Sequence, residues 1–352
     1  MKKLTTLIPA LLLLALFATP CSAAKQKVIE MNMTHCYMEK HSVIQGALIP
    51  WIKEIEKRTD GRVKIHYYTP NTLCPDSEVF DSIVSGAVDL GGHLIGRNPG
   101  KFPYTSAFDE PLIAPGSAAA SPALFEFITE NDWVAQEFSE VKFLTIWSSV
   151  AFQVHTKKPV RTLEDLKGMK IAISGSGTLN LTKGLGANPV MLSYSEMYLA
   201  LERGMAEGFI GPLAQMRTYR LNEPLKYTTV ANLRVSPLYL VMNKKLWDSL
   251  PADIQQIFEE TSGMALALKA GEALDLGTYD DGKWMQANGH TFIKLSDEEA
   301  ARWQAAAKPA WEVWLKDMEA KGNTRAKETL DLAIKLGAKW AKEVSLRGYE
   351  GE

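Results

Sequence analysis

The chain has 352 residues, and its 39 basic and 41 acidic side chains give a formal net charge of -2 at pH 7. With no basic excess, the composition argues against proteins that bind nucleic acid or an anionic membrane surface. The length is sufficient for two domains that each bury a hydrophobic core.

The first 24 residues have the pattern of a secretory signal peptide. Residues 1–3 include two lysines, residues 4–17 are apolar, and the following small residues suit cleavage near Ala23 or Ala24. Lipid attachment at Cys21 is an alternative, although Pro20 directly before it fits such a signal poorly. No other stretch is long and apolar enough to cross a bilayer, so we expect a soluble, exported mature protein.

The next part of the chain alternates between strand and helix patterns. Strands are predicted over residues 27–33, 63–68 and 88–91, and helices over residues 42–58 and 76–85. Cys36 and Cys74 follow the first two strands, which brings them together if these strands are parallel neighbours. In an oxidising compartment such a pair predicts a disulfide, with two unrelated buried thiols as the alternative.

After a turn-rich segment, residues 123–138 have a helical pattern, residues 141–147 are strand-like, and residues 151–155 are a candidate hinge strand. Residues 163–212 then read strand, helix, strand, helix, strand, which predicts a parallel sheet. Ligands of such sheets bind beyond the carboxyl ends of the strands. The loops to watch are therefore residues 174–178, 193–195 and 211–212.

Two segments resemble each other in pattern. Residues 78–89 align with residues 196–207, so that Gly86 meets Gly204 and Asp89 meets Glu207. This repeat favours two lobes of like build over one large sheet, with a small-molecule site in the cleft between them.

The last third of the chain is mainly helical. Strands are predicted over residues 227–230 and 235–242, and a long helix begins at Pro251 and runs towards Leu276. Ser296 and Glu299 form a capping-box pattern before another helix, and residues 330–344 are a final amphipathic helix. Met and Trp residues at helical spacing in this region are interpreted as core.

The order of several short motifs resembles the solute-binding proteins of tripartite ATP-independent periplasmic (TRAP) transporters. The motifs spread over most of the mature chain and include Thr59-Asp-Gly-Arg-Val-Lys-Ile65, Gly86-Ala-Val-Asp-Leu-Gly91, Leu163-Glu-Asp-Leu-Lys-Gly-Met-Lys-Ile171, Leu185-Gly-Ala-Asn-Pro-Val190 and Glu223-Pro-Leu-Lys-Tyr227. The resemblance implies an α/β, two-lobed periplasmic binding protein fold with hinge strands and a long helix that braces both lobes. We expect lobe I to hold residues 25–148 with part of 237–279, and lobe II to hold residues 149–236 with part of 280–352.

The resemblance also implies a function. A periplasmic receptor would capture a small organic ligand, such as an organic acid that can be aromatic, between its lobes and deliver it to a TRAP-type membrane permease. No cofactor is implied. The sequence contains no Gly-x-Ser-x-Gly, Walker or His-Glu-x-x-His motif, so we do not expect an enzyme. A periplasmic sensor or scaffold of the same fold is the alternative.

One departure from the family pattern affects the ligand. The family usually has an arginine after the segment that looks like Lys170-Ile171, where it pairs with a ligand carboxylate, and this chain has Ala172. Either another cation holds the anion, or the ligand is neutral or carries a phosphate. The candidate cations are Arg97, Arg234 and His93, with Arg217 behind them. Where the family tends to have an amide side chain this chain has Gly211, so we expect room for a bulkier or aromatic ligand.

The candidate ligand-binding residues lie at expected strand ends, hinges or aromatic positions near the cleft. Ser174, Ser176 and Thr178 stand at the amino end of a helix, which can hold an anion, or they are ordinary caps. A metal site built from His35, Cys36, His41, Cys74 and His93 matches no standard zinc spacing, so we expect none. The candidate set is His35, Tyr37, His93, Arg97, Trp147, Phe152, Ser174, Gly175, Gly211, Pro212, Met216 and Arg234.

Overall fold

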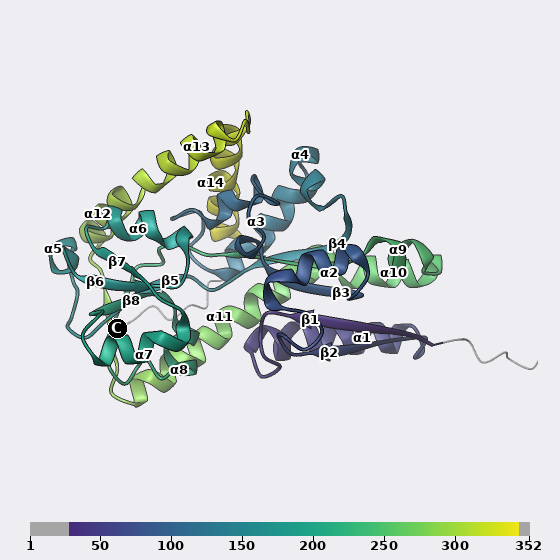
Figure 1. Cartoon of the computed structure of the whole chain (residues 1–352), viewed down its shortest axis with the longest axis horizontal. Helices are drawn as coiled ribbons and strands as arrows, with labels where there is room; N and C mark the ends of the chain where they lie inside the picture. The colour runs from purple at the N-terminus through teal and green to yellow at the C-terminus, as the bar shows by residue number, and fades with distance from the viewer. Residues whose placement is uncertain (1–27, 345–352) are drawn as a thin grey trace, which may run out of the picture.

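The computed structural model describes residues 28–344, which form two β-sheets with helices packed around each (Figure 1). One sheet has the strand order β2-β1-β3-β10-β4, and the other has the order β11-β9-β5-β8-β6-β7. We call the first sheet with its helices lobe I and the second with its helices lobe II. The two-lobed α/β fold expected from the sequence is confirmed, whereas the expected signal peptide lies outside the described residues.

Strand directions follow the sequence pattern. Lobe I contains β1 (Ile29–His35), β2 (Val63–Tyr68), β3 (Leu90–Leu94), β4 (Val141–Ser148) and β10 (Pro237–Asn243). Lobe II contains β5 (Phe152–Thr156), β6 (Lys170–Ile173), β7 (Asn188–Met191), β8 (Gly208–Pro212), β9 (Tyr227–Val230) and β11 (Thr291–Lys294). The strand β1 is parallel to β2 and β3, and β6 is parallel to β7 and β8. The parallel arrangement predicted for residues 163–212 is therefore confirmed.

The helices differ from the predicted ones at several starts, and the single helix predicted over residues 123–138 is divided at residues 130–131. Those of lobe I are α1 (Ile49–Arg58), α2 (Val79–Ser85), α3 (Ser117–Thr129), α4 (Asp132–Ala135), α9 (Lys244–Ser249) and α10 (Ala252–Thr261), with a π-helical turn η1 (Ile44–Leu48) before α1. Those of lobe II are α5 (Leu163–Leu166), α6 (Leu179–Gly184), α7 (Tyr194–Glu202) and α8 (Leu213–Thr218). The remaining helices are α11 (Gly263–Ala287), α12 (Asp297–Ala307), α13 (Pro309–Ala320) and α14 (Ala326–Glu343).

The long helix α11 braces the molecule, as the resemblance implied. It packs against β4 and α3 in lobe I and against α8 in lobe II, and Figure 1 shows it running from one lobe to the other. The helix predicted from Pro251 is interrupted at Ser262, because Gly263 adopts a left-handed backbone (φ 62°) between α10 and α11. The C-terminal helices are shared between lobes, since α12 and α13 contact α6 whereas α14 packs against α3.

The internal repeat has the same structural role in both lobes. Gly86 ends α2 and Gly204 follows α7, each with a left-handed backbone (φ 84° and 73°) that glycine adopts easily. The Asp89 carboxylate accepts a 2.7 Å hydrogen bond from the Asn32 backbone in β1. The Glu207 carboxylate accepts a 3.1 Å bond from the Lys170 backbone in β6. Each lobe thus ties its helix-to-strand connection to a neighbouring strand in the same way.

Two segments that connect the lobes run side by side. Residues 149–151 lead from β4 to β5, and residues 231–236 lead from β9 back to β10. They are joined by backbone hydrogen bonds from Ser149 to Ser236 (2.7 Å), from Phe152 to Arg234 (2.8 Å) and from Leu233 to Phe152 (3.0 Å). Any change in the angle between the lobes must bend this paired connection.

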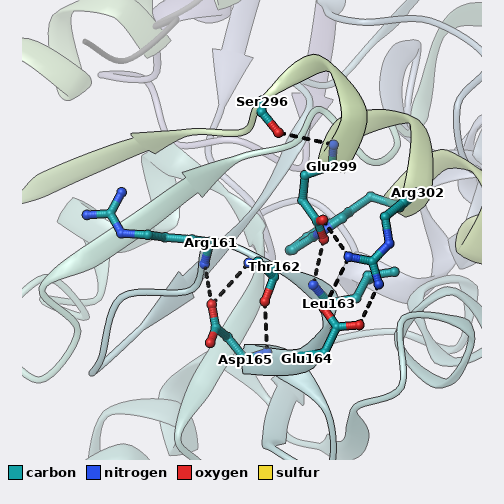
Figure 2. A network of polar contacts seen from close by, with 9 residues as sticks. Arg161, Thr162, Leu163, Glu164, Asp165, Ser296, Glu299 and Arg302 are labelled. Atoms are coloured by element: carbon teal, nitrogen blue, oxygen red, sulfur yellow. Dashed lines mark hydrogen bonds and ion pairs between the residues drawn. The ribbon is translucent and has the colours of Figure 1, made fainter.

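A polar network at the outer corner of lobe II joins α5 to α12 (Figure 2). The buried Glu299 carboxylate accepts hydrogen bonds from the Leu163 backbone (2.7 Å), from Trp303 Nε1 (3.0 Å) and from Arg302 Nη1 (2.7 Å). Arg302 also pairs with Glu164. We call this set the α5–α12 corner, and each of its carboxylates has partners.

Candidate functional site

Lobe I turns the carboxyl ends of β1 and β3 towards lobe II. Just beyond these ends lie Tyr37, two residues after β1, and Arg97, three residues after β3. Tyr37 is half-buried and Arg97 is exposed. Solvent therefore reaches both side chains beyond these strand ends, and their contact with a ligand stays a prediction.

Four rings form a continuous stack in lobe I. Trp147 stacks on His35 with ring centroids 5.4 Å apart, His35 lies 5.3 Å from Tyr37, and Tyr37 stacks on His41 at 3.8 Å. Trp147 and His35 are fully buried, so in this conformation they support Tyr37 from behind instead of facing the solvent.

The histidines of this stack are neutral at physiological pH. Burial lowers the pKa of His35 well below its ordinary value, and the neighbouring His93 and His41 lower it further. Burial also lowers the pKa of His41 to about 4. The stack therefore offers flat, uncharged surface, and it does not supply the positive charge that an anion needs.

Lobe II contributes a second aromatic group. Tyr194, the first residue of α7, stacks on Tyr219 at 5.1 Å and meets the edge of Phe209 at 6.1 Å. The Tyr194 hydroxyl bonds to Ser174 at the end of β6. The sequence marked residues 193–195 as a loop to watch and Ser174 as a candidate, but it did not single out Tyr194.

The aromatic groups of the two lobes influence each other electrostatically. Burial raises the pKa of Tyr37, and interactions with Cys36 and then with Tyr194 of the other lobe add to this shift. Burial likewise raises the pKa of Tyr194, while Arg234 and Arg97 act in the opposite direction. Tyr37 and Arg97 of lobe I thus interact electrostatically with Tyr194 of lobe II, and we call these three residues with Ser174 the inter-lobe site.

The expected space near Gly211 is filled. A Cβ atom at Gly211 would lie 1.9 Å from Cζ of Phe209, whose ring covers this glycine and stacks on His155 at 5.6 Å. Ala172 is buried in the same apolar cluster as Phe209. The expectation of extra room at Gly211 is therefore wrong, because an aromatic side chain of the protein already occupies it.

Three of the four candidate cations have a carboxylate partner. His93 Nε2 lies 2.9 Å from Asp76, Arg217 lies 3.1 Å from Asp281, and Arg234 lies 2.5 Å from Asp109. Arg97 forms no side-chain hydrogen bond or ion pair with any residue that the structure describes. It is the candidate cation whose donors are available to an added anion.

The other predicted residues lie around this centre at different depths. Phe152 is buried with the Arg234 guanidinium 5.1 Å from its ring, and Gly175 is half-buried directly after Ser174. Gly211, Pro212 and Met216 are buried in lobe II. Cys36 and Cys74 are free thiols, so the disulfide considered from the sequence is not formed in the structure. Within residues 28–344 no group of His, Cys, Asp and Glu side chains is arranged to hold a metal ion.

Comparisons with known proteins agree with this architecture. A family model described as bacterial extracellular solute-binding protein, family 7, matches residues 33–317. The C4-dicarboxylate-binding periplasmic protein DctP of Rhodobacter capsulatus is 28% identical over 260 residues, which are 72% of this chain and 77% of that protein.

Solved structures share the fold. A TRAP periplasmic solute-binding protein from Desulfovibrio salexigens superposes with a TM-score of 0.82 at 28% identity, covering 90% of this chain and 98% of that one. A TRAP solute-binding protein from Rhodoferax ferrireducens, in complex with copurified benzoate, has a TM-score of 0.81 at 23% identity over 90% of this chain and 100% of that one. At this lower identity the second similarity establishes the fold alone.

Proposed function

This chain belongs to the bacterial extracellular solute-binding proteins of family 7, and we propose that it captures an aromatic monocarboxylic acid between its lobes for a TRAP-type permease. Capture of an organic solute is the common role of this family. The finer proposal concerns which acid is bound and which residues hold it.

The observation that carries the proposal is the unpaired Arg97. Its side chain is exposed beyond β3 and makes no hydrogen bond or ion pair with a described residue. Arg97 interacts electrostatically with Tyr194 of the other lobe and with Asp76, but the Asp76 carboxylate is already paired with His93. A guanidinium donates two parallel hydrogen bonds to a carboxylate, which makes it the preferred anchor for this group. Arg97 therefore takes the role that Ala172 cannot perform in this chain.

The number of free cations favours one carboxylate. A dicarboxylate would need a second cation, but His93, Arg217 and Arg234 already face Asp76, Asp281 and Asp109. The relative from Rhodobacter capsulatus is named for C4-dicarboxylates, and the structure from Rhodoferax ferrireducens holds benzoate. Of these two ligand classes, the charge pattern of this chain supports the second.

The aromatic groups favour a planar ligand. The stacked pair of Tyr37 and His41 lies on the lobe I side, and the stacked pair of Tyr194 and Tyr219 lies on the lobe II side. Ring faces and edges of this kind attract another aromatic ring beyond the effect of burial alone. An aromatic acid bound by Arg97 would touch both lobes and so favour the closed arrangement.

The cellular setting is part of the proposal. We place the mature protein in the periplasm after cleavage near Ala23 or Ala24, where it passes its ligand to the membrane subunits of the permease. Within residues 28–344, no helix is both long enough and apolar enough to cross a membrane. We assign a binding role without catalysis, because capture and delivery need none.

A thermal-shift screen of the mature protein tests this function. Benzoate, succinate, a phosphate ester and a neutral polyol would each be added at a large excess. A compound present at about 100 times its dissociation constant stabilises the folded state by about 2.7 kcal/mol, which raises the melting temperature by several degrees. We expect the shift with benzoate. A shift with succinate alone would contradict the monocarboxylate proposal, and a shift with the polyol alone would contradict the anion site.

A further inference from the structure

The Arg234 guanidinium is buried between the lobes, with 4% of the residue exposed. Its Nη2 atom lies 2.5 Å from the Asp109 carboxylate of lobe I and 3.1 Å from Ser236 on the same connecting segment. Its Nη1 atom donates a 3.1 Å hydrogen bond to Thr178 of lobe II. A single side chain on the paired connection therefore bonds to both lobes.

The surroundings hold this guanidinium in place. The Phe152 ring lies 5.1 Å from its central carbon, and a Cβ atom at Gly177 would lie 2.6 Å from Nη1. The loop of residues 174–178 can approach so closely only because residue 177 has no side chain. Arg234 is thus enclosed on the lobe II side by this loop and neutralised on the lobe I side by Asp109.

The same loop forms one wall of the inter-lobe site. Ser174 bonds to the Tyr194 hydroxyl, and Thr178, four residues later, receives the bond from Arg234. The Thr178 carbonyl also accepts a 2.8 Å bond from Thr182, which fixes the loop to the start of α6. Holding Thr178 therefore limits where Ser174 and Tyr194 can lie relative to lobe I.

We infer that Arg234 is a positioning residue that ties the 174–178 loop of lobe II to Asp109 of lobe I and thereby keeps the inter-lobe site assembled. This role goes beyond the proposed capture of an acid. Its effect on ligand affinity rests on that proposed function, whereas the tie between the lobes does not. Arg234 acts on the solute through the loop, and its charge is directed to Asp109 instead of to the bound anion.

This role and a direct role in binding predict opposite results for one substitution. If Arg234 held the anion, then Asp109→Asn would free the guanidinium and strengthen binding. If Arg234 is a tie, the same substitution loosens the connection between the lobes and weakens binding. The direction of the change, and not its size alone, separates the two roles.

The experiment compares Asp109→Asn and Thr178→Val with the control Thr229→Val. Thr229 donates a buried 2.6 Å hydrogen bond to the Val160 carbonyl within lobe II, so this control removes a similar bond without crossing between lobes. Benzoate affinity is measured by calorimetry, and the radius of gyration without benzoate by small-angle X-ray scattering. We expect the two test variants to weaken benzoate binding by about threefold to tenfold and to increase the radius of gyration. The control should change neither.

Two further outcomes are decisive. Tighter benzoate binding in Asp109→Asn, or an unchanged radius of gyration in both test variants, would overturn the inference. The double variant Asp109→Asn/Thr178→Val should weaken binding by less than the product of the single effects, because both act through one guanidinium. If benzoate binds none of the proteins, the proposed ligand is wrong, while the scattering comparison still decides whether Arg234 ties the lobes.

Discussion

The α5–α12 corner and the inter-lobe site use similar side chains in different ways. At the corner, Arg302 reaches two carboxylates, and the buried Glu299 accepts three hydrogen bonds (Figure 2). Between the lobes, Arg97 reaches none, although it lies among polar and aromatic groups. Where every charged group is bonded within the protein, the network stabilises the folded chain. Where an arginine has no partner in the protein, its N–H donors are available to a ligand.

Two glutamates show the same contrast. At the corner, hydrogen bonds from Arg302 lower the pKa of Glu164 to about 2. Near the inter-lobe site, burial raises the pKa of Glu110 to about 8, with Arg234 opposing this shift and Asp109 adding to it. Arg302 thus stabilises the ionised form of Glu164, because it bonds that carboxylate directly. Arg234 bonds Asp109, so the neighbouring Glu110 keeps its proton up to about pH 8.

The largest expected effect is at the corner. Glu299→Ala leaves the Leu163 amide and the Trp303 indole without their acceptor in a buried place, which costs about 3 kcal/mol of folding free energy. The melting temperature should fall by several degrees, while benzoate affinity stays unchanged. A stability equal to that of the parent would show that this network does not hold α12 to lobe II.

The next largest effect is expected at the inter-lobe site and concerns the affinity for benzoate. Arg97→Ala should weaken benzoate binding by about tenfold or more, because a charged hydrogen-bond pair with the carboxylate is lost. Its melting temperature without benzoate should match that of the parent, since no partner in the described residues loses a bond. Arg302→Ala is the matched control, in which affinity is retained. Unchanged affinity in Arg97→Ala would assign the anion to another residue.

A smaller effect concerns Glu110. Between pH 4.5, its ordinary pKa, and about pH 8, the folded chain keeps a proton that the unfolded chain releases, so folding stability falls as pH rises through this range. Glu110→Gln removes this loss. Its melting temperature relative to the parent should rise by several degrees between pH 5 and pH 9. The similar shift of Glu137, to about pH 7, is present in both proteins and cancels. A constant difference across this range would contradict the raised pKa.

The smallest effect tests an exposed pair. Glu164→Gln breaks the ion pair with Arg302, but both side chains are largely solvated, and such pairs contribute little. The melting temperature should stay within about 1 °C of the parent in 0.15 M salt. A larger loss would mean that Arg302 needs both carboxylates to keep Glu299 in position.

Local patterns predicted the strands well and the helix starts less well. The strands β2 and β9 begin and end where the alternating residues indicated. In contrast, α3 begins at Ser117, six residues before the predicted start, and contains Pro122. Its first amides are bonded by Asp275 from α11, at 3.1 and 2.9 Å from Ser117 and Ala118. A cap that comes from 157 residues away in the chain leaves no local signal.

The site was predicted in part for a related reason. Strand ends and family pattern pointed to Tyr37, Arg97 and Ser174, which lie just after β1, β3 and β6, and their contact with a ligand stays a prediction. The pairing of Arg234 with Asp109 could not be predicted, because it depends on how residues 109 and 234 meet in space. Phe209 was missed because a buried aromatic residue in a strand is ordinary core by sequence, and its ring lies over Gly211 only in the folded chain.

The position of β10 in the first sheet has a consequence for the order of folding. This strand lies between β3 and β4, yet it is made only after almost the whole of lobe II. Until residue 243 has been added to the chain, β3 lacks one of its two neighbours and β4 has no neighbouring strand. The central strands of lobe II, β5 to β8, come from one continuous stretch of chain and form local contacts early. Lobe I, most of which is synthesised first, therefore cannot complete its sheet until most of lobe II has been made. Its open strand edges are exposed to aggregation during this time.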